Sequence, residues 1–225
     1  MTGSMTKNAL KSVKEAVDVR ERLIDAAEEL FAGQGFDGTS IRDLIAKAKS
    51  NLSSVNYHFG DKKVLYEELF RQRLCEMRES RLKAISQVMA GRGKPTLEKL
   101  LHAYSIDFLR PFSDAKRSQR FMRLFFREMA ERRLPKNMFL DEMAAPVMTA
   151  MEKALAVLCP DVSKHDIEMS VISITGQLVH IMQVRVLFEG AKGHPVASID
   201  IDDAIDHIVK FSAAGIRGCA KRNSK

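Results

Sequence analysis

The sequence contains no long uninterrupted apolar run, and this absence limits the classes of protein to which it can belong. No stretch of its 225 residues approaches the roughly 18 consecutive apolar residues of a membrane-spanning helix. The stretch from Met1 to Leu10 also lacks the apolar segment of a secretory signal. We therefore expect a cytoplasmic protein without a membrane partner.

Cysteine is scarce, and the patterns typical of catalytic centres are missing. Cys75, Cys159 and Cys219 are far apart and lack metal-ligand spacing, which fits a reducing cytosol better than a disulfide framework. No histidine follows a glutamate by three residues, as a di-iron bundle requires. No Ser-His-Asp, Cys-His or phosphate-loop pattern stands out either. We therefore expect no metal site, no cofactor and no enzymatic activity.

The formal net charge of +7 is unevenly distributed along the chain. Residues 1–80 hold 13 Lys and Arg against 13 Asp and Glu, so the excess lies in residues 81–225, with much of it between Arg110 and Lys136. The arginines of that run face either solvent or, for one or two of them, an anionic effector. Overall charge is thus weak support for nucleic-acid binding, and local patterns have to decide.

Apolar residues recur at helical spacing along almost the whole chain, and no β-hairpin signal, repeat or low-complexity tract interrupts them. We expect an all-α fold. A first helix is predicted to begin at Asp18, which offers a capping box with Glu21, and to end near Gly33. Later helices are predicted at residues 96–109, 118–130, 136–158, 163–188 and 201–216.

Two short helices with a tight junction follow the first helix and predict a helix-turn-helix. Ser40 and Asp43 form a possible capping pair for one helix, and Asn51 is a good N-cap for the next. The second short helix, at about 52–58, is rich in small polar side chains. Such a helix is unsuited to a hydrophobic core and suited to a surface that enters a DNA groove.

Residues 36–44 (FDGTSIRDL) and 51–62 (NLSSVNYHFGDK) resemble the TetR family of bacterial transcriptional regulators over roughly residues 19–69. The second segment, with Gly176, Gln177, His180 and Arg185 on a later helix, is similar to the branch with a CerR-like C-terminal domain. The resemblance implies a homodimer with a DNA-binding N-terminal domain. It also implies a C-terminal domain that dimerises and binds a small effector, which typically releases the DNA.

The turn departs from the family pattern. Members usually carry Ala-Gly-Val where this chain has Ala48, Lys49 and Ser50. A lysine in the left-handed conformation would cost about 1 kcal/mol if that backbone is kept. Ile45, where the family often has Ala, adds bulk between the two short helices.

The resemblance divides the chain into a flexible arm at residues 1–17, a helix-turn-helix domain at 18–66 and an effector-binding and dimerisation domain at 67–225. By analogy with the family, side chains near the turn reach phosphates, and the small polar residues Ser53, Ser54 and Asn56 read base edges. The expected DNA-binding residues are Thr39, Ser40, Arg42, Asn51, Ser53, Ser54, Asn56, Tyr57, His58 and Lys62.

Taken singly, several of these residues have a structural alternative. Tyr57 and Phe59 could be core residues, and Lys62 and Lys63 a solvated helix start. The whole ordered set favours DNA binding, with double-stranded operator DNA as the partner. The expected function is a ligand-responsive regulator, a repressor released from a palindromic operator. The alternative is a helical interaction module that kept the fold without binding DNA.

The C-terminal region is rich in Met and Phe, whose adaptable packing suits either a filled core or a cavity for a largely apolar small molecule. Polar anchors are expected on a later helix. The expected effector-binding residues are Phe108, Phe112, Met122, Phe125, Phe126, Met129, Met143, Val147, Met151, Gln177 and His180.

The last two helices carry enough apolar surface for a four-helix interface across a dimer axis. The interior of a bundle within one chain would use the same residue types, so the choice rests on the family resemblance. The expected dimer residues are Ile174, Leu178, Ile181, Ile205, Ile208 and Val209.

Overall fold

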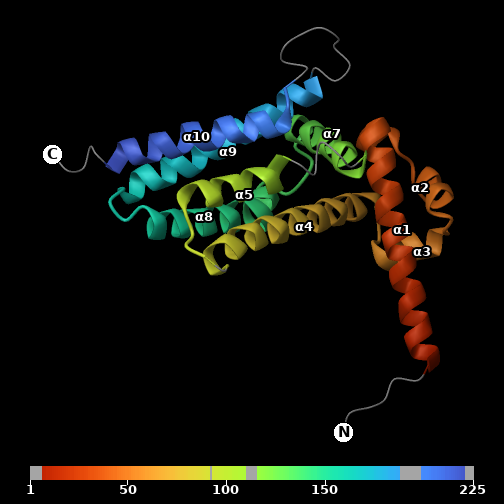
Figure 1. The fold of residues 1–225 in the computed structure, drawn as a ribbon. Coiled ribbons are helices and arrows are strands. Elements are labelled where there is room, and N and C mark those ends of the chain that lie inside the picture. The colour runs from red at the N-terminus through yellow and green to blue at the C-terminus, as the bar shows by residue number, and fades with distance from the viewer. Residues whose placement is uncertain (1–6, 92, 110–115, 188–198, 221–225) are drawn as a thin grey trace. The chain divides into compact units, whose positions relative to one another are not determined.

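Figure 1 shows a computed structural model of the chain, which describes residues 7–91, 93–109, 116–187 and 199–220. All regular secondary structure within these ranges is helical, so the all-α prediction is confirmed. The helices are α1 (Lys7–Gly38), α2 (Ile41–Ala48), α3 (Leu52–His58), α4 (Lys62–Ala90), α5 (Leu97–Leu109), α7 (Lys116–Glu131), a π-helical turn η1 (Leu140–Ala144), α8 (Ala145–Leu158), α9 (Lys164–Leu187) and α10 (Ile201–Ala220).

Helix α1 begins well before the predicted start at Asp18. Residues 7–17 of the expected arm are therefore helical, and Asp18 does not cap a helix. The segment contains neither glycine nor proline after residue 7, so nothing in it breaks a helix. The helix does not end near Gly33 as predicted but continues to Gly38, with a kink at Gly35, whose φ of 77° and ψ of 174° form a conformation that favours glycine.

The chain forms two compact units. The N-terminal unit contains residues 1–73 and 120–136, and the C-terminal unit contains residues 74–119 and 137–225. The sequence placed a boundary after residue 66 and did not anticipate that residues 120–136 group with the helix-turn-helix.

Aromatic and aliphatic side chains fill the core of the N-terminal unit. Leu23 and Ile24 of α1, Leu44 of α2 and Val55 of α3 are fully buried. The Phe31 ring packs edge-on against the ring of Tyr66 at 5.0 Å. Each short helix is thus anchored by one buried face, with Leu44 and Ala48 on α2 and Val55 on α3, while its other faces remain at the surface.

Arginines of the second segment, residues 120–136, bind acceptors on α1 within the same unit. The Arg120 Nε donates to Glu28 Oε1 at 3.1 Å, and Arg127 donates to the Phe31 carbonyl at 3.2 Å. Arg133 pairs with Asp37 at 2.5 Å. Arg120 and Arg127 therefore make part-buried structural contacts, while the Arg133 pair lies at the surface as the solvated-face hypothesis expects, and all three have partners within the chain.

Helices α5, α8, α9 and α10 pack together in the C-terminal unit, with α9 beside both α8 and α10. Among the predicted dimer residues, Ile174, Leu178, Ile205, Ile208 and Val209 are between 0% and 7% exposed in the single chain. Because they already fill the core of one protomer, they cannot form a dimer surface, and that prediction is wrong for them. Ile181 is half-buried.

Within the part of the chain that the structure describes, one helix is long and apolar enough to cross a membrane by length and composition alone. It is α9, over Lys164–Arg185, and a core helix of a soluble protein meets the same criterion. About a third of this span is buried, including Ile174 and Leu178, so packing within the chain accounts for part of its apolar content.

Candidate nucleic-acid interface

Local capping chemistry positions the first short helix. The Ser40 side chain accepts from the Asp43 amide at 3.2 Å, and the Ser40 amide donates back to Asp43 Oδ2 at 3.2 Å. The Ser40 hydroxyl also donates to Asp43 Oδ2 at 2.6 Å, and this hydrogen bond first and the one from the Ser40 amide second lower the pKa of the Asp43 carboxyl. The predicted capping pair is confirmed, and it fixes the point at which the chain enters α2.

The turn after α2 keeps the backbone for which the family uses glycine. Lys49 has φ 49° and ψ 51°, the left-handed conformation, and its amide closes α2 by donating to the carbonyls of Ala46 and Ile45. The departure noted in the sequence has therefore not reshaped the turn. Its cost is about 1 kcal/mol of backbone strain.

Helix α3 is anchored at both ends. The Asn51 side chain accepts from the Ser54 amide at 2.8 Å, as its predicted role of N-cap requires. Val55 is fully buried and Phe59 is 5% exposed, so they attach the helix to the core. Phe59 is thus a core residue, which is the alternative that the sequence left open for it.

The outer face of α3 carries polar side chains with room to contact a partner. Ser53 and Asn56 are exposed, and Tyr57 is 81% exposed, so the alternative that made Tyr57 a core residue is wrong. Its ring lies edge-on to the His58 ring at 5.0 Å. Ser54 and His58 are half-buried, and the Ser54 hydroxyl donates to the Asn51 side chain. Arg42 on α2 is also exposed.

Besides the capping residues Ser40 and Asn51, the predicted DNA-binding residues Thr39 and Lys62 have side chains occupied by structural contacts. Thr39 is 1% exposed, and its hydroxyl donates to the Gly35 carbonyl at 2.8 Å. The Lys62 ammonium donates to the carbonyls of Phe36 and Thr39 at 2.9 and 3.0 Å and lies 4.3 Å from the centre of the Phe36 ring. Both side chains satisfy carbonyls at the end of α1, so neither is free to bind a phosphate in this structure.

Two cationic side chains that the sequence reasoning missed are better placed. Lys49 is exposed at the turn, and the Lys63 side chain is 68% exposed, with a loose 3.8 Å pair to Glu67. Lys47, by contrast, pairs with Glu29. A hydrogen bond from Lys47 is the largest cause of the lowered pKa of Glu29. The sequence could have identified Lys49, because it stands at the turn in a position where family members usually carry glycine.

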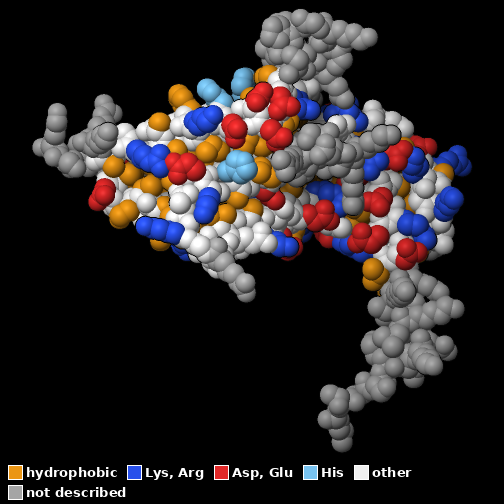
Figure 2. Space-filling view, viewed as in Figure 1, with side chains coloured by type: hydrophobic (Ala, Val, Ile, Leu, Met, Phe, Trp, Pro, Cys, Tyr) orange, Lys and Arg blue, Asp and Glu red, His pale blue; other side chains and the backbone are white. Residues whose placement is uncertain are grey.

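Acidic and basic side chains alternate over the face shown in Figure 2, and no large surface of one sign covers the part of the chain that the structure describes there. The candidate interface carries exposed charges of both signs, with Asp43 and Asp61 among the acidic ones. Arg42, Lys49 and Lys63 supply its exposed positive charge.

The predicted effector-binding residues do not form one cluster. Phe108, Met143, Val147 and Met151 are buried in the C-terminal unit. Four others belong to the N-terminal unit: Met122, Phe125, Phe126 and Met129. Met129 is 49% exposed, so it is not a core residue.

The predicted polar anchors lie elsewhere. Gln177 donates to the Ser212 hydroxyl at 3.3 Å in a groove between α9 and α10, and His180 is exposed. Neither side chain joins the Phe108 core, which corrects the expectation of an apolar cavity with these two anchors. Phe112 lies outside the described residues.

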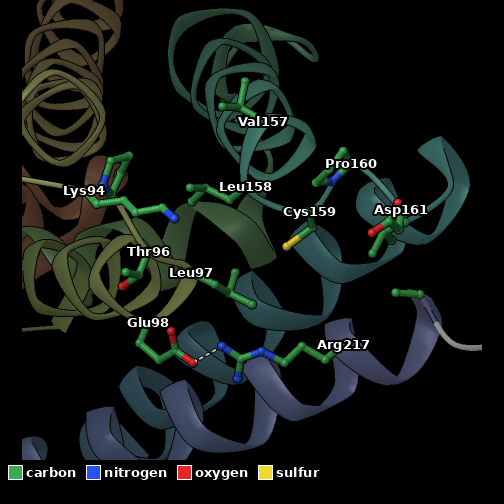
Figure 3. Close-up of a pocket in the computed structure, with 13 residues that line it drawn as sticks. Lys94, Thr96, Leu97, Glu98, Val157, Leu158, Cys159, Pro160, Asp161 and Arg217 are labelled. Carbon is green, nitrogen blue, oxygen red and sulfur yellow. Dashed lines mark hydrogen bonds and ion pairs between the residues drawn. The ribbon is translucent and has the colours of Figure 1, made fainter.

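A separate depression of about 610 Å³ lies where the start of α5, the end of α8 and the end of α10 meet (Figure 3). Arg217 pairs with Glu98 across it, and this pairing, after a hydrogen bond from the backbone amide of Glu98, lowers the pKa of that carboxyl. Burial raises the pKa of the Cys159 thiol at its edge. Glu98 and Arg217 neutralise each other, and Lys94 and Asp161 are the other charged residues that line the depression.

Comparisons with known proteins agree with the sequence resemblance. Residues 23–69 match the family described as bacterial regulatory proteins of the tetR family, and residues 107–215 match a tetracyclin repressor-like C-terminal domain. The latter description names no CerR-like branch, so that finer resemblance stays a prediction.

The individual relatives are similar mainly in the N-terminal region. The chain is 36% identical over 50 residues to IcaR of Staphylococcus aureus strain Newman, a negative regulator of the biofilm operon icaADBC. That match covers 22% of this chain and 27% of IcaR. It is 32% identical over 62 residues to the regulator AcrR of Shigella flexneri, covering 28% and 29%. The chain thus spans just over a quarter of the length of these relatives.

The fold likeness extends further. The crystal structure of a TetR-like transcriptional regulator from Rhodococcus sp. RHA1 superposes with a TM-score of 0.60 at 20% identity, over 89% of this chain and 96% of that one. At this identity the likeness concerns the fold alone. The family is one of regulators rather than enzymes, which agrees with the missing catalytic patterns. The chain belongs to the TetR family of bacterial regulatory proteins.

Proposed function

We propose that the protein is a cytoplasmic, ligand-responsive transcriptional regulator that binds operator DNA as a homodimer and acts as a repressor. The observation that carries this proposal is the geometry of α3, where two buried anchors hold a helix with exposed Ser53, Asn56 and Tyr57. A fixed helix with small outward side chains can enter a major groove, while a mobile one would have to be ordered first. The negative-regulator role of IcaR supports the assignment as a repressor.

The exposed groups fall into two roles. Asn56 carries a paired donor and acceptor that match an adenine edge, and Ser53 lies on the same helix for a second base contact. Tyr57, Arg42, Lys49 and Lys63 suit phosphate contacts, which fix register without reading sequence. Because Lys62 and Thr39 bind protein carbonyls, their contribution is to hold the end of α1 against the start of α4.

A single α3 buries little DNA contact area, so a dimer is expected to read two half-sites about 34–36 Å apart or at a multiple of that spacing. The exposed apolar side chains of α9 and α10 supply a surface for a second copy: Met169, Ile172 and Phe211, which are 46%, 50% and 64% exposed. Gly176 and Gly215 are exposed on the same two helices, and their lack of side chains permits close helix approach.

The test is fluorescence anisotropy with duplex DNA taken from the region upstream of the protein's own gene, over a series of salt concentrations. Tyr57→Ala is expected to weaken binding to all sequences alike, and Tyr57→Phe separates the hydroxyl from the ring. Asn56→Ala is expected to relax preference at one base position by about 1–3 kcal/mol. Wild-type protein with no salt-dependent binding would instead support the interaction-module alternative.

A further inference from the structure

One buried cation in the C-terminal unit forms no ion pair with any residue that the structure describes. Arg81 of α4 is 3% exposed. Its Nη1 donates to the Met143 sulfur at 3.0 Å, and its guanidinium carbon lies 3.9 Å from the centre of the Phe108 ring. Both contacts are favourable, but a thioether and an aromatic ring carry no net charge.

No carboxylate among residues 7–91, 93–109, 116–187 and 199–220 forms an ion pair with Arg81. The acidic group that acts on it electrostatically is Asp107, which is occupied at one oxygen by the Ser80 hydroxyl. The negative charge of Asp107 favours the charged guanidinium, but burial has the larger effect and lowers the pKa of Arg81. Buried charges are normally paired because an isolated one costs several kcal/mol. Arg81 departs from that rule.

A comparison within the same helix makes the departure clear. Arg73, about two turns earlier on α4, is 4% exposed and equally buried. Its side chain pairs with Glu28 at 2.5 Å and with Asp25 at 3.2 Å. Among the described residues, two carboxylates thus form ion pairs with Arg73, whereas Asp107 acts on Arg81 without pairing with it.

The surroundings of Arg81 are otherwise apolar. Phe108 is 3% exposed, Met143 is 6% exposed, and Tyr104, which also acts on Arg81 electrostatically, is 2% exposed. A second polar group on the same helix as Phe108, the Ser105 hydroxyl, is buried without a hydrogen-bond partner among the described residues. Met143 adapts its shape easily, so this region can rearrange around an apolar group.

We propose that Arg81 binds the carboxylate of the effector, a monoanion with an apolar tail. This inference rests on the proposed function, since it names the chemical class of the ligand to which the regulator responds. A planar guanidinium accommodates a carboxylate through two parallel hydrogen bonds. One positive charge balances one negative charge, and the Phe108 and Met143 side chains suit the apolar remainder of the molecule.

The test uses octanoate, decanoate and dodecanoate, with the corresponding straight-chain alcohols as neutral controls. At least one carboxylate is expected to raise the melting temperature of the full chain and to weaken its operator binding, while the alcohol of the same length does neither. In Arg81→Met the carboxylate affinity is expected to fall about tenfold or more, as for loss of a charged hydrogen bond. Arg81→Gln serves as a second neutral variant.

Melting without ligand distinguishes a binding role from a structural one. Arg81→Met is expected to melt at or above the wild-type temperature, since it removes an unpaired buried charge. Arg73→Met is expected to melt several degrees lower, since it leaves Glu28 with fewer partners. A loss of stability in Arg81→Met like that in Arg73→Met would overturn the proposal. A wild-type protein that ignores all three carboxylates, or an Arg81→Met variant that still responds to them, would do the same.

Failure of the proposed function would be seen separately. It would appear as absence of operator binding by the wild-type protein before any ligand is added. If the protein binds its operator and this binding is unchanged by any of the three carboxylates, the carboxylate-binding role of Arg81 is refuted while the role as a regulator is not.

Discussion

Arg73 and Glu28 form a buried ion pair inside the N-terminal unit. The Arg73 Nε donates to Glu28 Oε2 at 2.5 Å, with the two side chains 5% and 0% exposed. Glu28 Oε1 accepts from Arg120 Nε at 3.1 Å, so one carboxylate joins α1, α4 and α7. The glutamate lies on the apolar side of α1 because it binds arginines from two other segments there.

Replacing Glu28 with glutamine keeps the shape of the side chain and removes the buried carboxylate that Arg73 and Arg120 share, which leaves Arg73 with Asp25 and Arg120 with the exposed Glu29. We expect Glu28→Gln to lower the free energy of unfolding of the N-terminal unit by about 3 kcal/mol or more. Urea denaturation followed by circular dichroism measures this change. The neighbouring Glu29→Gln is the control, since Glu29 is exposed and its pairs are worth at most about 1 kcal/mol. Equal effects of the two substitutions would contradict the assigned role.

Lys49 occupies a left-handed conformation, and that strain is removable. We expect Lys49→Gly to raise the melting temperature, with a gain of about 1 kcal/mol because glycine adopts this backbone without a steric penalty. Lys47→Gly is the matched control inside α2, where glycine should instead cost about 1 kcal/mol. If Lys49→Gly also destabilises the protein, the turn is not strained as its dihedral angles imply.

Features that depend on near neighbours in the chain could be predicted from the sequence. The caps at Ser40 and Asn51 and the extent of α3 follow from a side-chain acceptor placed three residues before a free amide. The structure agrees because no distant part of the chain competes for those groups. The start of α1 was missed for the converse reason, since a cap-like residue inside a helix has no effect when the preceding residues are themselves helical.

Features that depend on distant partners could not be predicted. The sequence contains an exposed-looking lysine at residue 62 but does not show the Phe36 and Thr39 carbonyls that its ammonium reaches. Similarly, apolar residues on α9 and α10 suit either the inside of a protomer or a dimer surface. Ile174 and Ile205 are buried inside the protomer, whereas Ile172 is exposed. The difference arises from a small rotation around the helix axis, which the sequence does not show.

Lys62 and Lys63 are adjacent and carry the same charge, yet we expect opposite consequences from their removal. Lys63→Ala should reduce the slope of log affinity against log salt by about 1, as loss of one phosphate contact does, and leave the melting temperature unchanged. Lys62→Met should lower the melting temperature, because the Phe36 and Thr39 carbonyls lose their donor, with little effect on the slope. Anisotropy titrations and thermal melts of both variants measure these differences. A reduced slope for Lys62→Met alone would restore the phosphate role expected from the family.

The exposed apolar side chains of α9 and α10 lead to a prediction about assembly. Ile172→Asp places a charge in the middle of that surface, and burying it against a second copy without a partner would cost several kcal/mol. We therefore expect the variant to sediment as a monomer and to lose most of its affinity for a two-half-site operator, while its helical content is unchanged. Val157→Asp is the control, since Val157 is 69% exposed on α8 and lies away from the α9–α10 groove. Analytical ultracentrifugation of the two variants separates the outcomes, and dissociation caused by Val157→Asp instead would move the dimer surface to the end of α8.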